Sequence, residues 1–243
     1  MSPTRDVMAV IGGMGPLASA EFVNTVYQRA AFERDQDAPS LLLWSDPTFP
    51  DRTTELLEGR AHVLADCLRN AIEQCCAMGA TQVVIACMTM HSAVPLLPPH
   101  LSDRIVSLVD VLLTAAIEAR RPHLIMSSLG TRRVHVLENH PLWPEASRFL
   151  IWPDEQDQQR VHAAIYAVKR NNGVPGAIAL LESLLQRYGL DAFAAACTEW
   201  HIVQKQWARR SPVTCLDPLD IIADRFIAAG AVSDRAVAQR AGA

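Results

Sequence analysis

The sequence predicts an α/β fold of two similar lobes, each with a mostly parallel sheet. Three observations lead to this prediction. Short apolar runs alternate with longer amphipathic segments, the alternation restarts at His123, and each half has an apolar run that leads into a cysteine, Cys87 or Cys197. We therefore expect two βα lobes related by a pseudo-twofold axis, with the active site in the cleft between them.

The first half opens with an apolar run, Val7–Ile11, which predicts a strand and leads into the glycine-rich turn GGMGP. Ala18–Phe32 then carries apolar residues at helical spacing, and Pro16 lies near its start, where proline is tolerated. Ser40–Trp44 predicts a second strand, and the loop SDPTFPDRTT follows it. Strands that alternate with helices in this way favour parallel pairing.

A long amphipathic helix is predicted to begin near Thr53, because apolar side chains then recur every three or four residues until Gly79 ends the pattern. Gln82–Ala86 is the predicted strand that leads into Cys87. The remaining elements of this half are a strand over residues 105–109 and a helix over residues 110–120.

After His123 the same order returns. The stretch HLIMSSLGTRR predicts a strand, a glycine and a loop, and FLIWPDEQ predicts a second short strand. Two helices are predicted over residues 161–169 and 177–188, with the breaker run NNGVPG between them. Ala192–Ala196 then leads into Cys197. The predicted boundaries are 1–110 for the N-terminal lobe, 111–215 for the second lobe and 216–243 for a C-terminal helix that packs back on the first lobe.

The composition argues against several classes of function. The formal charge of −4 and the lack of a basic cluster argue against a nucleic-acid partner, and apolar runs that are short and interrupted argue against a membrane span. The sequence enters a strand-like run almost at once, so we expect no signal peptide. Six cysteines without secretory features indicate reduced thiols and a cytoplasmic protein. No Cys-x-x-Cys pair occurs, so no metal site is expected.

Two cysteines at strand ends can perform acid/base chemistry. Ligands bind at the carboxyl ends of parallel strands, where the predicted layout places Gly12, Gly13, Cys87, Gly130 and Cys197. A thiol has a pKa near enough to neutrality to donate a proton, and its thiolate can remove one without a metal. Sulfurs on opposite faces of a bound carbon would exchange its proton and invert the stereocentre. Neighbouring threonine hydroxyls would stabilise the carbanion.

The alternative to a catalytic role, for any single cysteine, is that it packs in the core as a small hydrophobic residue. We prefer this alternative for Cys67, Cys75, Cys76 and Cys215, which lie on apolar faces or lack polar neighbours. Cys87 and Cys197 differ from them, because each follows an apolar run and has a threonine within two residues. His91 stands four residues after Cys87, but two ligands without a third do not predict zinc. We expect His91 to pack or to hydrogen-bond at a helix start.

Six stretches in order resemble the aspartate/glutamate/hydantoin racemase superfamily, and in particular its aspartate racemase branch. They are VIGGMGPLASAEF, SDPTFPDRTTELLEG, ACMTMH, LGTRR, WPDEQDQQRVHAAIYAVKRNNG and ACTEW, and CLDPLDI resembles a C-terminal strand end. The resemblance covers nearly the whole chain. It implies a two-lobed α/β enzyme, a homodimer, and racemisation of a small-molecule amino-acid substrate without pyridoxal phosphate or another cofactor.

The resemblance also assigns roles to residues. Cys87 and Cys197 would be the catalytic acid/base pair. Arg52 would hold the substrate's side-chain carboxylate through its planar guanidinium, and Lys169 would assist. The other residues expected to bind substrate are Gly13, Met14, Thr53, Met88, Thr89, Thr131, Thr198 and Glu199. The open alternatives are a surface loop charge for Arg52, an exposed helix end for Lys169, a turn cap for Thr131 and a solvated charge for Glu199.

Met88 departs from the family pattern, which has asparagine after the first cysteine. Methionine has no donor, and a lost hydrogen bond to a charged group costs about 1.5–3 kcal/mol. We therefore expect an aspartate- or glutamate-like acidic or related amino acid, without fixing its side chain. Two further functions stay open: a lyase or isomerase of the same fold that acts on a dicarboxylate or modified amino acid, and a non-catalytic binding module.

Overall fold

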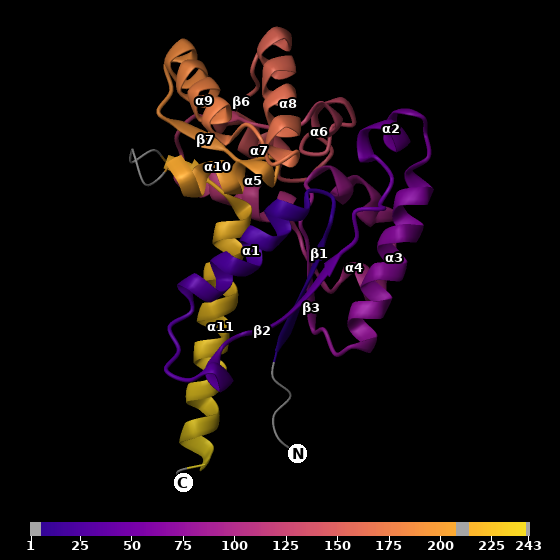
Figure 1. Cartoon of the computed structure of the whole chain (residues 1–243), viewed down its shortest axis with the longest axis vertical. Helices are drawn as coiled ribbons and strands as arrows, with labels where there is room; N and C mark the ends of the chain where they lie inside the picture. Colours follow the sequence, from indigo (N-terminus) through magenta and orange to yellow (C-terminus); the bar gives the residue numbers. More distant parts are fainter. Residues whose placement is uncertain (1–5, 208–213, 242–243) are drawn as a thin grey trace.

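The computed structural model describes residues 6–207 and 214–241, with side chains placed for 6–207 and 214–230. The described chain contains two four-stranded sheets (Figure 1). The first consists of β1 (Val7–Gly12), β2 (Ser40–Ser45), β3 (Gln82–Ile85) and β4 (Ile105–Val106). The second consists of β5 (His123–Ile125), β6 (Leu150–Ile151), β7 (Ala192–Ala194) and β8 (Thr214–Leu216).

Both sheets follow the same plan. The strand order is β2-β1-β3-β4 in the first and β6-β5-β7-β8 in the second, so in each half the first and third strands lie at the centre. Every strand pair is parallel. The predicted α/β fold, with two similar lobes of parallel sheet, is confirmed.

Helices connect the strands. In the first half they are α1 (Pro16–Arg29), α2 (Arg52–Leu57), α3 (Ala61–Ala77), α4 (Pro99–Ser102) and α5 (Leu108–Ala119), with the 3-10 segments η1 (Asp35–Asp37) and η2 (Thr89–Leu96). The second half contains α6 (Leu129–Arg133), α7 (Trp143–Ala146), η3 (Ser147–Phe149), α8 (Glu155–Lys169), α9 (Val174–Tyr188), α10 (Glu199–Trp207) and α11 (Pro218–Ala241). None of the helices in the described ranges is long and apolar enough to cross a membrane.

The apolar runs form strands because both faces of each sheet are covered. In β1, Met8 and Val10 face a core that both halves share, whereas Ala9 and Ile11 face a separate core with α3. The shared core also contains residues of α5 and α11, and α11 packs against α1 and α5 (Figure 1). A third core lies between the second sheet and the helices α8, α9 and α10. The boundaries at residues 110 and 215 stay a prediction.

The long helix predicted from Thr53 is wrong in one respect, because the structure divides it into α2 and α3. Gly59 lies between the two helices with a φ of +73°, a backbone conformation that side-chain-bearing residues rarely adopt. The apolar period continues across this break, so the period alone gave no sign of it. The division leaves α2 as a short separate helix with Arg52 as its first residue.

Several predicted boundaries shift by a few residues, and side-chain caps explain two of these shifts. The strand expected over 105–109 ends at Val106, because Ser107 accepts a hydrogen bond from the backbone N–H of Asp110 and so begins α5. Helix α8 begins well before residue 161, because the Asp154 carboxylate accepts from the backbone N–H of Asp157. Both caps are local, and neither changes the order of the elements.

Candidate active site

The two predicted catalytic cysteines occupy equivalent turns. Cys87 follows β3, and its carbonyl accepts from the N–H of Met90 as η2 begins. Cys197 follows β7, and its carbonyl accepts from the N–H of Trp200 as α10 begins. Each side chain is 8% exposed. In each half, therefore, the third strand delivers a thiol to the start of a helix at the carboxyl edge of the sheet.

Both sulfur-bearing side chains line one cavity of about 20 Å³. Its other lining residues are Asp51, Arg52, Thr53, Thr89, Ser128, Tyr166, Lys169, Thr198 and Glu199. A cavity of this volume holds about one water molecule, so the lining must open before an amino acid enters. The structure thus gathers polar groups of both halves around the two thiols.

Eight of the twelve residues expected at the site line this cavity, and four do not: Gly13, Met14, Met88 and Thr131. Met14 contributes only its carbonyl oxygen, which accepts from Arg52 and Lys169 at 3.0 and 2.5 Å. Thr131 lies behind Thr89, and their hydroxyl oxygens are 2.9 Å apart. Gly13 has a φ of +86° and lies against the backbone of Asp46.

Met88 is not among the residues that line the sulfur cavity. Its side chain is 1% exposed and belongs to the apolar core that both halves share, together with Ile125 and Ala196. Methionine fills irregular apolar space well, so packing in the core explains why a methionine stands at this position. The expectation that the residue after Cys87 contacts the substrate finds no support in this arrangement.

Three lining residues were missed by sequence reasoning: Asp51, Ser128 and Tyr166. Asp51 precedes Arg52 and caps α2 by accepting from the N–H of Thr54. An aspartate just before a helix is a cap signal that sequence reasoning could have used to find it. Tyr166 stands one helical turn before Lys169 on α8 and donates to the second Asp51 oxygen at 3.2 Å. This bond joins the two halves at the edge of the cavity.

Arg52 folds inward onto backbone oxygens. Its guanidinium donates to the carbonyls of Met14 and Pro50, both at 3.0 Å, and more weakly to that of Phe49 at 3.4 Å. A carboxylate could replace these three carbonyl acceptors, because it binds guanidinium more strongly through paired, charge-assisted bonds. The arrangement rules out the alternative of a free surface charge for Arg52.

Glu199 connects Lys169 to the second cysteine. The Cys197 thiol donates to Glu199 Oε2 at 2.8 Å, and Lys169 Nζ forms an ion pair with Oε1 at 3.0 Å. Glu199 is 2% exposed, so the alternative of a solvated charge is wrong. Lys169 sits at the end of α8 but is mostly buried and paired, which rules out a free helix end.

This arrangement holds Cys197 in its thiol form. Burial raises the pKa of the Cys197 thiol well above its usual value, and the negative charge of Glu199 raises it further, while Lys169 opposes both. Burial is the largest single influence and lowers the pKa of the Lys169 ammonium, but the charges of Glu199 and the two cysteines together outweigh it, so the net shift is upward. Lys169 therefore stays positively charged beside the sulfur.

Two glycines permit this close packing. A Cβ at Gly15 would overlap the Glu199 carboxylate, and a Cβ at Gly130 would overlap the Thr53 hydroxyl. Gly15 belongs to the turn before α1, and Gly130 lies in α6 of the opposite half. Each glycine thus lets a lining side chain of the other half approach the backbone.

A histidine lies four residues after each cysteine. His91 Nε2 accepts from the N–H of Leu108, the first residue of α5, so its proton is on Nδ1 and is donated to the Cys87 carbonyl at 3.0 Å. Burial lowers the pKa of His91 to about 4. Both nitrogens are used within the protein, so His91 is a structural link and offers no metal ligand with Cys87.

His201 makes a different link. Its Nδ1 donates to Asp217 at 2.6 Å, just before α11. Its Nε2 lies 2.9 Å from the hydroxyl of Thr25, which itself donates to the Glu21 carbonyl and therefore accepts from the ring. Burial alone would lower the pKa of His201, but the charge and hydrogen bond of Asp217 together with the charge of Asp220 outweigh burial and raise the pKa. His201 is therefore a buried imidazolium.

Among the described residues, His201, Asp217 and Asp220 form the one group close enough to hold a metal ion. Protein cations already occupy its surroundings, however. Lys205 and Arg29 pair with Asp220 at 3.1 and 2.8 Å, and Thr25 takes the free nitrogen of His201. The group is therefore an ion-pair network that joins α1, α10 and α11.

Comparison with known proteins agrees with this geometry. The chain matches the model of the Asp/Glu/hydantoin racemase family over residues 11–226. Its fold is similar to an aspartate racemase from Picrophilus torridus (21% identity, TM-score 0.77, 93% of this chain and 94% of that one). It is also similar to an aspartate racemase homologue from Pyrococcus horikoshii (18%, 0.65, 93% and 99%) and an allantoin racemase from Klebsiella pneumoniae (15%, 0.55, 94% and 89%). The chain therefore belongs to the Asp/Glu/hydantoin racemase family and is a racemase, an enzyme of the isomerase class.

Proposed function

We propose that the protein racemises an acidic or related amino acid by a two-base mechanism in which Cys87 and Cys197 exchange the α-proton. One observation carries the proposal: both thiols line the same small cavity, and each comes from the equivalent strand end of its half. No cofactor takes part. We also propose that the protein is a homodimer and acts in the cytoplasm, as the resemblance of its sequence motifs to the racemase family implies.

The reaction begins at one face of the substrate. The Cys87 thiolate removes the α-proton, the C–H electrons remain on the substrate as a carbanion, and the Cys197 thiol gives its proton to the opposite face. The product is the other enantiomer, Cys87 is now a thiol and Cys197 a thiolate. Proton exchange with water resets the pair, and the opposite enantiomer reacts with the roles reversed.

The neighbouring groups fit these steps. Glu199 accepts a hydrogen bond from the Cys197 thiol in the resting arrangement, which favours Cys197 as the partner that begins the reaction protonated. Hydroxyl donors would stabilise the carbanion, and Thr89 and Thr198 line the cavity; the Thr198 hydroxyl would exchange its bond to the Ala86 carbonyl for one to the substrate. Arg52 and Lys169 supply positive charge for the substrate carboxylates.

Substrate entry requires movement of the segment around Arg52. The cavity of about 20 Å³ is too small for an amino acid, and the Asp51–Tyr166 bond closes its edge. Opening would release Arg52 from its backbone partners, and closing on a substrate would exchange those carbonyls for a carboxylate. This exchange favours an amino acid with a second carboxylate or an equivalent acceptor in its side chain.

The lyase alternative rested on Met88, and the position of Met88 in the shared core removes that motive. Exchange with solvent tests the racemase proposal directly. Each enantiomer of aspartate, glutamate and their amides is incubated with the protein in heavy water, and chirality and α-deuterium are measured together. We expect deuterium at the α-carbon of the inverted product. Turnover of a substrate with retained α-hydrogen, or no exchange with any member of the series, contradicts the proposal.

A further inference from the structure

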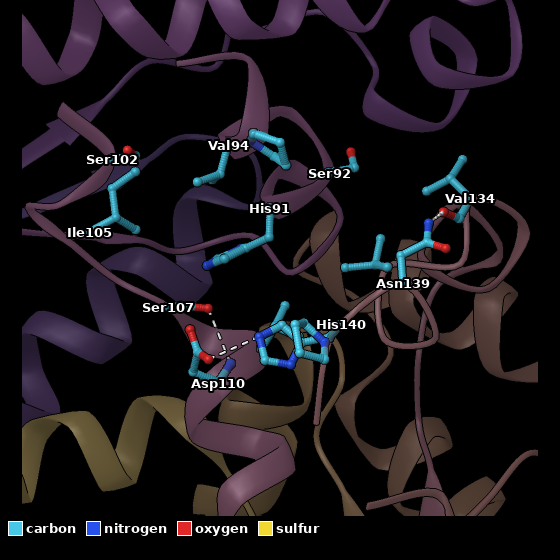
Figure 2. A pocket seen from close by; sticks show the side chains of 14 residues that line it. His91, Ser92, Val94, Ser102, Ile105, Ser107, Asp110, Val134, Asn139 and His140 are labelled. Carbon is cyan, nitrogen blue, oxygen red and sulfur yellow. Dashed lines mark hydrogen bonds and ion pairs between the residues drawn. The ribbon is translucent and has the colours of Figure 1, made fainter. Parts of the chain in front are cut away.

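A second and larger cavity, of about 490 Å³, has neither of the two cysteines in its lining; Figure 2 shows the residues that line it. It is lined by segments 91–110 of the first half and 134–141 of the second. It shares no lining residue with the sulfur cavity. Its volume falls within the range of about 300–1,000 Å³ that small-molecule sites occupy.

The walls of this cavity are apolar on both sides. Val94, Ile105 and Val109 come from the first half, and Val134 and Val136 face them from the second. These side chains offer contact surface for an apolar molecular body and no hydrogen bonds. His91 also lines the cavity, but both of its ring nitrogens are already bonded within the protein.

One end of the cavity is acidic. Asp110 lies in the first turn of α5, where its Oδ1 is 2.9 Å from Nε2 of His140 (Figure 2). His140 Nδ1 accepts from the N–H of Leu142, so the ring carries its proton on Nε2 and donates to Asp110 as a neutral group. This single neutral donor leaves the second carboxylate oxygen as an acceptor at the mouth of the cavity.

The Asn139 amide also favours a donor ligand. Asn139 uses its amide nitrogen to donate to the Val134 carbonyl, so its oxygen is the side of the amide left for a ligand. No lysine or arginine is among the lining residues. A phosphate or carboxylate would therefore meet Asp110 without a compensating cation, which disfavours anions.

We propose that this cavity binds a small organic amine, with its apolar body between the valines and its ammonium group on Asp110. The assignment goes beyond the proposed racemase activity and does not depend on it. Its wall includes the His91 ring that holds the Cys87 carbonyl, so the ligand would lie next to a residue that orients the first sulfur turn.

Three probes of matched shape test the proposal: phenethylamine, 2-phenylethanol and phenylacetate. Binding to the full-length protein is measured by ligand-observed NMR, with competition among the three. We expect the amine to bind at least about fivefold more tightly than the alcohol, and phenylacetate to bind more weakly than both. Asp110→Asn should reduce the amine to the level of the alcohol and leave the alcohol unchanged.

Two further variants keep the test decisive. Glu118→Gln removes an exposed carboxylate from the same helix outside the cavity, and it should leave all three affinities unchanged. Val94→Trp fills the space between the walls and should abolish binding of both amine and alcohol. Equal binding of the three probes, no binding of any of them, or amine binding that survives Asp110→Asn overturns the proposal.

Discussion

The two halves of this molecule place their cysteines in the same way but surround them differently. Each thiol follows the third strand of its sheet, and each has a histidine four residues later that fastens the turn next to the helix after the fourth strand. His91 makes this link as a neutral ring between backbone groups, whereas His201 makes it as a cation between Asp217 and Thr25. Topology therefore fixes where each sulfur lies.

The residues beside the sulfurs decide how tightly each holds its proton. Two residues after Cys87 stands Thr89, an uncharged hydroxyl bonded to Ser128 and Thr131 of the other half. Two residues after Cys197 stands Glu199, whose carboxylate accepts a hydrogen bond from the thiol. Burial, with the charge of Glu199 added to it, raises the pKa of Cys197, so this sulfur keeps its proton and would enter the proposed reaction as the protonated partner. Similar backbones thus place the two sulfurs in unequal surroundings.

The largest effect should come from removing either sulfur. Cys87→Ala and Cys197→Ala should each lower the racemisation rate by roughly 10³-fold, because each removes one of the two proton carriers. The remaining thiol should still exchange the α-proton of one enantiomer without inversion, and the preferred enantiomer should be opposite in the two variants. Chiral chromatography combined with α-deuterium content in heavy water measures both quantities.

Cys67→Ala is the matched control for these variants, because Cys67 lies on α3 outside the sulfur cavity. It should retain full activity. If either catalytic variant racemises at the rate of the control, the two-base mechanism is wrong. If both exchange the same enantiomer, the sulfurs do not face opposite sides of the α-carbon.

The sequence predicted the positions of both cysteines because strand and helix periods are local signals. The apolar runs before Cys87 and Cys197 identify strands whose ends meet at one sheet edge, whichever side chains follow. Contacts that depend on three-dimensional packing have no comparable local pattern in the sequence, so they could not be predicted. The Tyr166–Asp51 bond joins residues 115 positions apart, and the direction of the Met88 side chain depends on the turn after β3.

The histidine pair should give opposite pH dependences of stability. His91 has a folded pKa of about 4 against an unfolded value near 6.5, so the unfolded chain binds more protons between these values. Stability should fall by about 3 kcal/mol as pH drops through this window. The raised pKa of His201 works in the other direction: its contribution is fully present below about pH 6.5 and is lost as pH rises through the folded pKa.

Urea unfolding between pH 4 and 9 measures these contributions through the free energy of unfolding. His91→Asn should flatten the acid side of the profile, and His201→Gln should flatten the alkaline side. Each variant serves as the control for the other. Profiles in which both variants change on the same side, or in which neither slope changes, would refute the assigned protonation states.

The residue directly after each cysteine also differs between the halves. Met88 packs into the shared core, whereas the Thr198 hydroxyl donates to the Ala86 carbonyl of the first half at 3.2 Å. Met88→Asn buries an amide among apolar side chains and should lower the free energy of unfolding by about 2 kcal/mol without improving aspartate turnover. Met88→Leu preserves apolar volume and should cost less. A gain of aspartate turnover in Met88→Asn would show that this side chain does reach the substrate.

The smallest predicted effect tests the carboxylate that makes the sulfurs unequal. Glu199→Gln removes the charge that raises the pKa of Cys197 and leaves Lys169 beside the thiol, so the thiolate fraction of Cys197 should increase. We expect iodoacetamide to alkylate Cys197 about tenfold faster relative to Cys87. Mass spectrometry of both peptides gives the ratio of the two rates.

The ratio is informative because the two thiols share one cavity, so opening of the site affects both rates and cancels. Glu118→Gln, on the surface of α5, should leave the ratio unchanged. If Glu199→Gln also leaves it unchanged, Glu199 does not control the proton of Cys197, and the difference between the halves must come from burial alone. A raised ratio together with slower racemisation would instead show that a firmly held proton on Cys197 is what the reaction uses.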